Sequence, residues 1–491
     1  MNRKTICVLL LLAAMLLTAF AGCGKSTEPD PGTSAPTDTA GPGQTTDAAP
    51  EVTTAAEFVY EGPLKKYDNE EFRIVTWTGT DEWVLEADVN TTILDSKTFY
   101  HLTAVEAETG VLFEIAQELS GGYGAHESFI AKMALLEGSD DIDLICQYSL
   151  AAIYGALQGI YVDLSELPAI RWDAPYWSND FVTTNTFNGH IYYCTGEMTR
   201  TTIYKMFLMT FNYDLAARFA IGDVHAMVED GEWTIARLHE LSQNVYEDLN
   251  ANEKVDAGDL YGLVCSEYNS LDAFQAACNL VGIVHNDFGE LEVNPDFYGE
   301  YGSDVVDRLR RLFHQNDGAY CHTKINPVYD AMMEGKALFQ AVYSEQLINN
   351  LQPSGINYGI LPMPKYNEEQ TNYHTCLGMT YSIFSVPRHA NDKEMSAVVI
   401  DALAHDGYES LTPYIFQTSL KSRYAKTDID AEMFDYLRDG VIYNPERLLD
   451  TVDMFALVRR SVRDNESLTT YYAEKVDQIE AELSNVNFAF S

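Results

Sequence analysis

Phe72-Arg73-Ile74-Val75-Thr76-Trp77 is the stretch that decides the fold. It is rich in β-branched and aromatic residues, and a glycine follows two positions later, as expected for a strand that runs into a loop. The next predicted elements are a helix from about 99 to 110, a strand at 111–115, a helix at 126–137 and a strand at 142–146. This β-α-β-α-β alternation predicts an α/β fold with a parallel sheet, in which ligands bind beyond the carboxyl ends of the strands.

The rest of the chain continues with short strands and helices. Asn188-Gly189 predicts a turn between apolar segments, and 203–211 is a strongly apolar strand candidate. Thr234 is a predicted N-cap. Helices are expected at 234–246, 271–280, 304–313 and 393–405, and a mostly helical tail covers about 430–483.

The N-terminus has the features of a secretory signal that ends at a cysteine. A basic start precedes an apolar stretch from Ile6 to Ala21, which is too short to span a membrane comfortably. The run Phe20-Ala21-Gly22-Cys23 resembles the lipobox of bacterial lipoproteins, although leucine is usual in place of Phe20. We therefore expect a signal peptide at 1–22 and a lipidated Cys23; an ordinary signal with an incidental cysteine is the alternative.

Composition separates a spacer from a folded unit. Residues 24–56 contain no aromatic residue and one valine, so 23–57 is predicted to be a disordered linker. Residues 58–491 are rich in aromatic and aliphatic side chains and long enough for two lobes. The net charge of -43 disfavours nucleic acid and anionic lipid headgroups as partners. The partner is expected to be neutral or cationic, and the protein a monomer.

Six cysteines follow Cys23, with no CxxC pair and no regular spacing. Neither a zinc site nor a dense disulfide framework is indicated. Buried free thiols are expected, and the even number leaves disulfides open outside the cell.

A set of local patterns, in a fixed order, resembles the extracellular solute-binding proteins of ABC importers, the broad family that contains maltose-binding protein. The most distinctive are the run Met333-Glu334-Gly335-Lys336-Ala337-Leu338-Phe339 and the stretch Tyr358-Gly359-Ile360-Leu361-Pro362-Met363-Pro364-Lys365. The others are the first-strand end at 76–81 and the segments at 141–145, 159–164, 187–193 and 212–215.

The resemblance implies a two-lobed fold of the periplasmic-binding-protein type, with a ligand cleft between the lobes and strands that cross between them. Lobe one would hold about 58–198 and 342–400, and lobe two about 199–341 and 401–491. The crossings are expected near 197–202 and 337–343. Hinge closure around a solute is the motion that this architecture implies.

The resemblance also places candidate ligand-binding residues at the ends of predicted strands. An aromatic ring can pack on a sugar face while a carboxylate accepts hydrogen bonds from hydroxyl groups. Each aromatic candidate could instead belong to the core, and the polar ones could be turn residues. The predicted set is Trp77, Asp81, Gln147, Tyr148, Ser149, Trp177, Tyr343 and Glu345.

A second constellation, at 248–259, has the oxygen spacing of an EF-hand-type calcium loop. The predicted ligands are Asp248, Asn250, Asn252, Asp256 and Asp259, with Lys254 offering its carbonyl oxygen. Position six of the loop, usually glycine, is Glu253, and a left-handed conformation there costs about 1–2 kcal/mol. A structural calcium ion is the hypothesis, and a solvated acidic loop is the alternative.

No sequence motif of a serine hydrolase, zinc protease or dinucleotide-binding enzyme occurs. The expectation is therefore a protein without catalytic activity, lipid-anchored on the outer face of the bacterial plasma membrane. It would capture a carbohydrate and deliver it to an ABC permease. A peptide or another polar metabolite is the alternative ligand, and a surface sensor or adhesion module the alternative role. A glycosidase needs only two carboxylates, which sequence alone does not rule out.

Overall fold

The structure is a computed structural model and describes residues 58–491, except residue 81 and the segments 87–91, 136–140, 324–325 and 450–451. The predicted lipidation site Cys23, the signal, the linker and Asp81 lie outside the described residues. The folded unit begins at Phe58, where the predicted linker ends. Within the described ranges, no helix combines the length and apolar character needed to cross a membrane.

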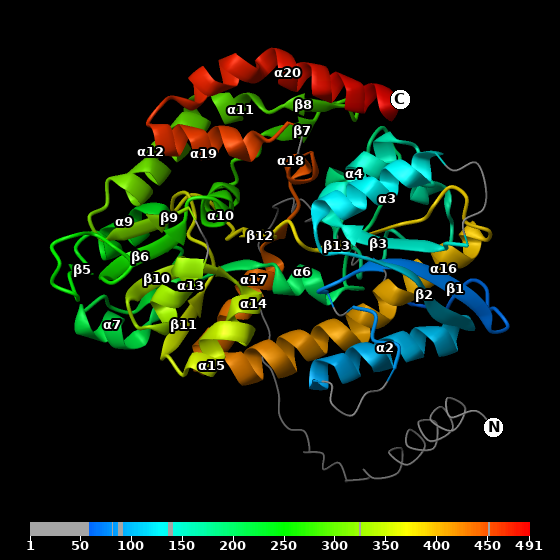
Figure 1. The fold of residues 1–491 in the computed structure, drawn as a ribbon, viewed down its shortest axis with the longest axis horizontal. Helices are drawn as coiled ribbons and strands as arrows, with labels where there is room; N and C mark the ends of the chain where they lie inside the picture. Colours follow the sequence, from blue (N-terminus) through cyan, green and yellow to red (C-terminus); the bar gives the residue numbers. More distant parts are fainter. Residues whose placement is uncertain (1–57, 81, 87–91, 136–140, 324–325, 450–451) are drawn as a thin grey trace, which may run out of the picture. The chain divides into compact units, whose positions relative to one another are not determined.

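The first sheet confirms the predicted alternation (Figure 1). Its strand order is β13-β3-β1-β2, with β1 (Glu70–Trp77) parallel to both β2 (Val111–Leu119) and β3 (Leu144–Tyr148). The strand β13 (Ser382–Ser385) runs antiparallel to β3. The connecting helices are α2 (Ile93–Thr109), α3 (Tyr123–Leu135) and α4 (Ser149–Leu157).

Gly110 ends α2 and turns the chain into β2. Its φ of 79° is left-handed, a conformation that glycine adopts without a steric penalty. A Cβ atom at this position would lie 1.9 Å from the Tyr67 carbonyl oxygen. The close approach of the segment before β1 therefore requires glycine here.

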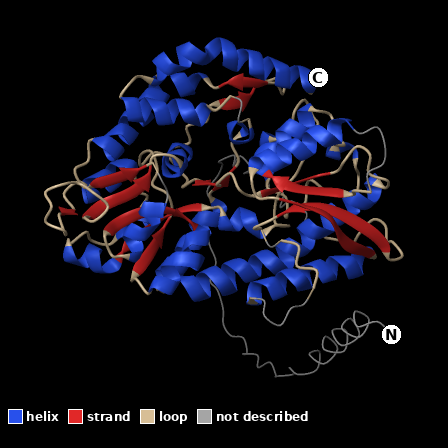
Figure 2. Cartoon of the chain, viewed as in Figure 1, coloured by secondary structure: helices blue, strands red, loops and turns tan. Residues whose placement is uncertain are grey.

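The second sheet has the order β11-β4-β10-β6-β5, with β9 beside β6. Its strands are β4 (Phe207–Asn212), β5 (Tyr246–Glu247), β6 (Leu260–Ser266), β9 (Ala319–His322), β10 (Ala337–Tyr343) and β11 (Tyr358–Leu361). The strand β10 is parallel to β6 and antiparallel to β4. Helices lie on both sides of each sheet (Figure 2), so the described unit has two α/β lobes.

The lobe boundaries differ from the predicted ones. The strand β10, expected to be a crossing at 337–343, is a central strand of the second sheet, and β11 pairs with β4 in the same sheet. The chain therefore returns to the first lobe only after Leu361, and residues 342–361 belong to the second lobe. Both strands consist mostly of apolar residues, so sequence alone did not show which sheet would hold them.

The remaining elements cover one of the lobes or join them. The short ones are η1 (Leu164–Glu166), α5 (Asn179–Thr184), α6 (Arg200–Tyr204), α7 (Tyr213–Arg218), α8 (Val224–Glu229), α9 (Ile235–Ser242), α11 (Pro295–Tyr298), α13 (Asn326–Met333), α14 (Ser344–Gln346), η2 (Leu347–Leu351) and α15 (Gln352–Ser354). Two small sheets pair β7 (Ile283–His285) with β8 (Leu291–Val293), and β12 (Thr375–Cys376) with β14 (Val441–Ile442). The longer helices are α10 (Asn269–Ala277), α12 (Glu300–His314) and α16 (Lys393–Asp406). The helices η3 (Gly407–Leu411) and η4 (Tyr414–Tyr424) come next. The predicted helical tail at about 430–483 corresponds to α17 (Asp428–Asp439), α18 (Pro445–Leu448), α19 (Met454–Asp464) and α20 (Leu468–Ala489).

Two of the segments that join the lobes pair with each other. Met206, just before β4, forms an antiparallel bridge with Leu377, and the Gly378 N–H donates to the Lys205 carbonyl at 2.7 Å. A third connection is helical: α16 packs on α2 in the first lobe, and η4 packs on α17 in the second. This helical connection contacts the first connection, which is the segment that leads into β4. The contact is at Gly407, where an added Cβ atom would lie 2.2 Å from the Glu197 carbonyl oxygen.

The buried side chain of Glu82 ties these connections to the first sheet. One carboxyl oxygen accepts from the Thr201 hydroxyl at 2.6 Å, and the other accepts from the Ser382 hydroxyl. Trp77 Nε1 donates to the same Ser382 hydroxyl at 3.0 Å. Burial raises the Glu82 pKa, although these hydrogen bonds act to lower it. The end of β1, the first connection and the start of β13 are thus held by one side chain.

Candidate functional site

The carboxyl ends of strands from both lobes meet on the connection at 378–381. At the end of β3, the Ser149 N–H donates to the Tyr381 carbonyl at 3.1 Å, and the Ser149 hydroxyl donates to the Met379 carbonyl. At the end of β10, a Cβ atom added to Gly378 would lie 2.4 Å from Cε1 of the Tyr343 ring. The strand ends where α/β folds bind ligands therefore lie at the join between the lobes.

Tyr343 and Glu345, both predicted, lie on the second-lobe side of this region. The Tyr343 ring packs against Phe207 with centroids 4.1 Å apart and is half-buried, and burial raises its pKa. The Glu345 carboxylate forms an ion pair with Lys205, whose ammonium group is 6.0 Å from the Tyr343 ring centre. An aromatic face and a charged pair thus lie together at the end of β10.

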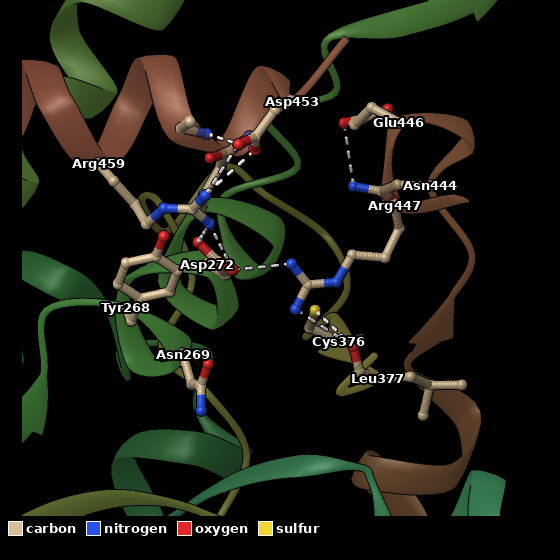
Figure 3. Close-up of polar contacts among 12 residues, drawn as sticks. Tyr268, Asn269, Asp272, Cys376, Leu377, Asn444, Glu446, Arg447, Asp453 and Arg459 are labelled. Carbon is tan, nitrogen blue, oxygen red and sulfur yellow. Dashed lines mark hydrogen bonds and ion pairs between the residues drawn. The ribbon is translucent and has the colours of Figure 1, made fainter. Parts of the chain in front are cut away.

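Tyr268, which lies two residues beyond the end of β6, was not in the predicted set, although Tyr148 was placed there because it comes two residues after the predicted strand at 142–146. Its side chain is 54% exposed, and the Arg459 guanidinium lies 4.4 Å from its ring centre. Arg459 also pairs with the fully buried Asp272 at 2.7 Å, and Arg447 pairs with Asp272 at 2.8 Å (Figure 3). Both guanidinium groups pair with this one buried carboxylate, and Arg459 also pairs with Asp453 at 3.1 Å. These ion pairs fix the start of α10 beside Tyr268.

The first-lobe candidates divide into one half-buried ring and three residues used in packing. Tyr148 is half-buried, and its ring is 5.3 Å from that of Trp77. Trp77 itself is 5% exposed and hydrogen-bonded to Ser382. Gln147 is buried and accepts from the Tyr161 hydroxyl at 2.8 Å, and Ser149 is buried as described above. For Trp77, Gln147 and Ser149 this geometry favours a packing role over the predicted ligand contact.

Trp177 lines a cavity of about 320 Å³ on the other side of the paired connections. Successive residues of a paired extended segment face opposite sides. Leu377 and its partner Met206 line this cavity, whereas the next residue, Gly378, faces the Tyr343 ring. The Trp177 ring packs at 4.9 Å on Trp172 and is 5% exposed. The cavity wall also includes Glu197, Arg438 and Tyr443, and the Glu197 carboxylate is 3.4 Å from the Arg438 guanidinium.

Comparison with solved structures identifies the architecture. The chain is similar in fold to the sugar-binding protein MalE from Xanthomonas citri, with a TM-score of 0.56 and 15% identity, covering 86% of this chain and 99% of that one. A sugar transporter protein from Rhizobium etli in an open conformation gives 0.55 and 13%, covering 86% and 98%. A family 1 extracellular solute-binding protein from Bifidobacterium longum subsp. infantis gives 0.52 and 13%, covering 84% and 100%.

The chain has the two-lobed solute-binding-protein fold. These neighbours agree with the family resemblance in the sequence. No family model matches the sequence, and no curated protein matches it.

The predicted calcium loop lies between β5 and β6. Glu253, at position six, has a φ of 61°, the left-handed conformation that an EF-hand-type loop needs there. Asp259 is 1% exposed; its Oδ2 accepts from Tyr246, and its Oδ1 is buried with no hydrogen-bond partner. Asp248 Oδ1 is also buried and unpartnered. These free oxygens, at the first and last positions of the loop, fit a bound cation.

The other predicted ligands lie within the same loop. Asp256 accepts from the Asn252 amide at 2.8 Å and from the Asn250 amide at 3.1 Å. Within the described residues, no cluster of three or more His, Cys, Asp or Glu side chains is gathered as a metal site. A loop of three carboxylates, two amides and one carbonyl would depend on amide and carbonyl oxygens for half of its ligands.

Glu446, on α18 between the lobes, is a buried carboxyl group with an altered pKa. It is 2% exposed; Oε1 accepts from the Gly282 N–H at 2.9 Å, and Oε2 has no hydrogen-bond partner. Burial raises its pKa from 4.5 to about 7, although the backbone hydrogen bonds and nearby Arg447 act to lower it. The folded protein thus holds a proton here that the unfolded chain releases near pH 4.5.

We predict that Glu446→Gln loses less stability than the parent protein when the pH is raised from 5 to 8. A raised carboxyl pKa makes the folded state lose stability as the pH rises from about 4.5 through about 7. Glutamine does not titrate, so the variant should gain relative to the parent at pH 8 by up to about 3 kcal/mol. Urea unfolding at both pH values measures this, with Glu369→Gln, an exposed glutamate, as control. Equal pH dependence in Glu446→Gln and parent would contradict the assignment.

Proposed function

We propose that this protein is an extracellular, lipid-anchored solute-binding protein that captures a mono- or oligosaccharide between its lobes and delivers it to an ABC permease. The observation that carries the proposal is the match of almost the whole folded unit to sugar-binding and sugar-transport proteins of the same two-lobed architecture. The neighbours are binding proteins, which supports capture without catalysis.

The chemistry at the strand ends supports a carbohydrate. Tyr268 offers an exposed ring next to a fixed guanidinium, and Tyr343 offers a half-buried ring beside the Lys205–Glu345 ion pair. Rings of this kind bury the apolar face of a sugar, and charged groups exchange hydrogen bonds with its hydroxyl groups. We assign the solute to this side of the connections, with Tyr148 facing it from the first lobe.

The N-terminal sequence supports the location and the partner. A lipid on Cys23 would hold the protein at the outer face of the plasma membrane, and the linker at 23–57 would let it reach a permease in the same membrane. One acyl chain gives only marginal membrane binding, whereas two or more anchor stably. A peptide or another polar metabolite remains the second candidate ligand, because charged groups at the strand ends would also suit it.

We predict that a sugar, and not a peptide, raises the melting temperature of the full chain in a thermal-shift screen of sugars, polyols and peptides. A ligand that binds only the folded state stabilises it by mass action.

Tyr268→Ala should weaken binding of the best sugar about tenfold, which corresponds to about 1.4 kcal/mol. Phe288→Ala, which truncates an even more exposed aromatic residue at the β7–β8 turn, should leave the affinity unchanged.

Three results would count against this assignment. Stabilisation by peptides alone would replace the sugar by a peptide. Equal affinity losses in Tyr268→Ala and Phe288→Ala would contradict the assignment of the solute site to the strand ends. Turnover of a chromogenic glycoside that is lost on replacing one carboxylate would make the protein a glycosidase.

We also propose a structural calcium ion in the loop at 248–259. Support comes from the unpartnered oxygens of Asp248 and Asp259 and from the left-handed Glu253. Three carboxylates and two neutral amides suggest a weak site of the extracellular kind, which millimolar calcium would fill. The ion would hold the loop that leads into β6, the strand that ends two residues before Tyr268.

The calcium proposal predicts that calcium raises the melting temperature and that a chelator reverses the rise. Asp248→Ala should abolish the calcium-dependent shift, because it removes the ligand at the first loop position. Asp287→Ala, an exposed carboxylate outside the loop, should keep the shift. Differential scanning fluorimetry with calcium and with EGTA measures both. A parent protein that is indifferent to chelator would overturn the calcium site.

A further inference from the structure

Two cysteines lie directly opposite each other on neighbouring strands of the second sheet. β6 and β9 are parallel, and their register pairs Cys265 with Cys321. The two Sγ atoms are 3.4 Å apart. Neighbouring strands are about 4.8 Å apart, which is within the Cα separation that a disulfide spans. Small side-chain rotations would therefore bring the sulfur atoms to bonding distance.

The surroundings of the two sulfur atoms differ in accessibility. Cys265 is fully buried, whereas Cys321 is partly exposed, near the end of the edge strand β9. Burial and the neighbouring thiol raise the Cys265 pKa, so the partly exposed Cys321 is the better placed of the two thiols to react first. Of the other cysteines in the described ranges, Cys146 contacts Glu82 at 3.5 Å, and Cys376 contacts the Leu377 carbonyl at 3.4 Å. The sulfur contact between strands is thus specific to the Cys265–Cys321 pair within this set.

We propose that Cys265 and Cys321 form a disulfide in the mature protein. The expectation of an oxidising environment rests on the proposed extracellular function. The oxidant is a small-molecule or protein disulfide. The Cys321 thiolate attacks one of its sulfur atoms and releases one thiol; Cys265, deprotonated, then attacks Cys321 Sγ and releases the second thiol. Two protein thiols become one disulfide, and one oxidant disulfide becomes two thiols.

The disulfide would lie next to the candidate solute site. The next residues in register are Ser266 and His322, and the Glu267 N–H donates to the His322 carbonyl at 3.1 Å. Tyr268 follows immediately. A covalent link between β6 and β9 would close the loop formed by residues 266–320 and reduce the conformational freedom of the unfolded chain. It would also hold the strand end that carries the exposed ring, so the oxidised protein would present a more ordered site.

Peptide mapping of the intact lipoprotein tests the pairing directly. The full chain is purified from membranes without reductant, denatured in N-ethylmaleimide and digested for mass spectrometry. The expected result is a linked peptide pair that contains Cys265 and Cys321, with Cys146, Cys194, Cys278 and Cys376 alkylated. Alkylation of both Cys265 and Cys321, even after treatment with oxidised glutathione, would overturn the proposal.

A melting experiment tests the consequence. Reductant should lower the melting temperature of the parent by a few degrees. Cys321→Ser should have the same lowered melting temperature without reductant, and reductant should not change it further. Cys278→Ser, at another fully buried cysteine, should remain sensitive to reductant. A reductant effect that persists in Cys321→Ser would assign the effect to a different group. Mapping uses no solute, so a linked pair without any sugar binding would contradict the proposed function and leave the disulfide intact.

Discussion

The pairing of two of the three connections between the lobes is the constraint on which the rest of the structure depends. A bridge between Met206 and Leu377 and the Gly378–Lys205 hydrogen bond at 2.7 Å place the two chain crossings side by side. Glu82 anchors them to the first sheet through Thr201 and Ser382. A buried carboxyl group costs free energy unless its oxygens are hydrogen-bonded, and here the connections themselves supply the donors. The hinge and the core of the first lobe therefore form one hydrogen-bonded unit.

This arrangement also decides what each side of the connections presents. Gly378 leaves room for the Tyr343 ring, so the end of β10 can lie directly on the join between the lobes. On the opposite side, Met206 and Leu377 line the cavity beside Trp177. A rotation about the paired segments would open one side as it closes the other. Strand-end groups from both lobes can thus approach each other without rebuilding either core, which is the mechanical requirement for capture between lobes.

Local patterns predicted most of the fold, because each rests on short-range physics. The β-branched run at 72–77 became β1, Gly110 ended α2 in the left-handed conformation, and Thr234 capped α9. The sheet that holds β10 and β11 depends on long-range pairing, and two apolar strands carry no local mark of their partners. Trp77 shows the same limit at the site: an aromatic residue at a strand end can face a ligand or, as its hydrogen bond to Ser382 shows, the core. Tyr268 followed a predictable strand, but only its 54% exposure distinguishes it from the many buried tyrosines.

We propose that the two lobes close around a solute at the paired connections. Small-angle X-ray scattering of the full chain, with and without the sugar that gives the largest thermal shift, tests it most directly. We expect a smaller radius of gyration at saturating sugar, because closure brings the two lobes together. An unchanged radius of gyration in a protein that has bound the sugar would contradict it.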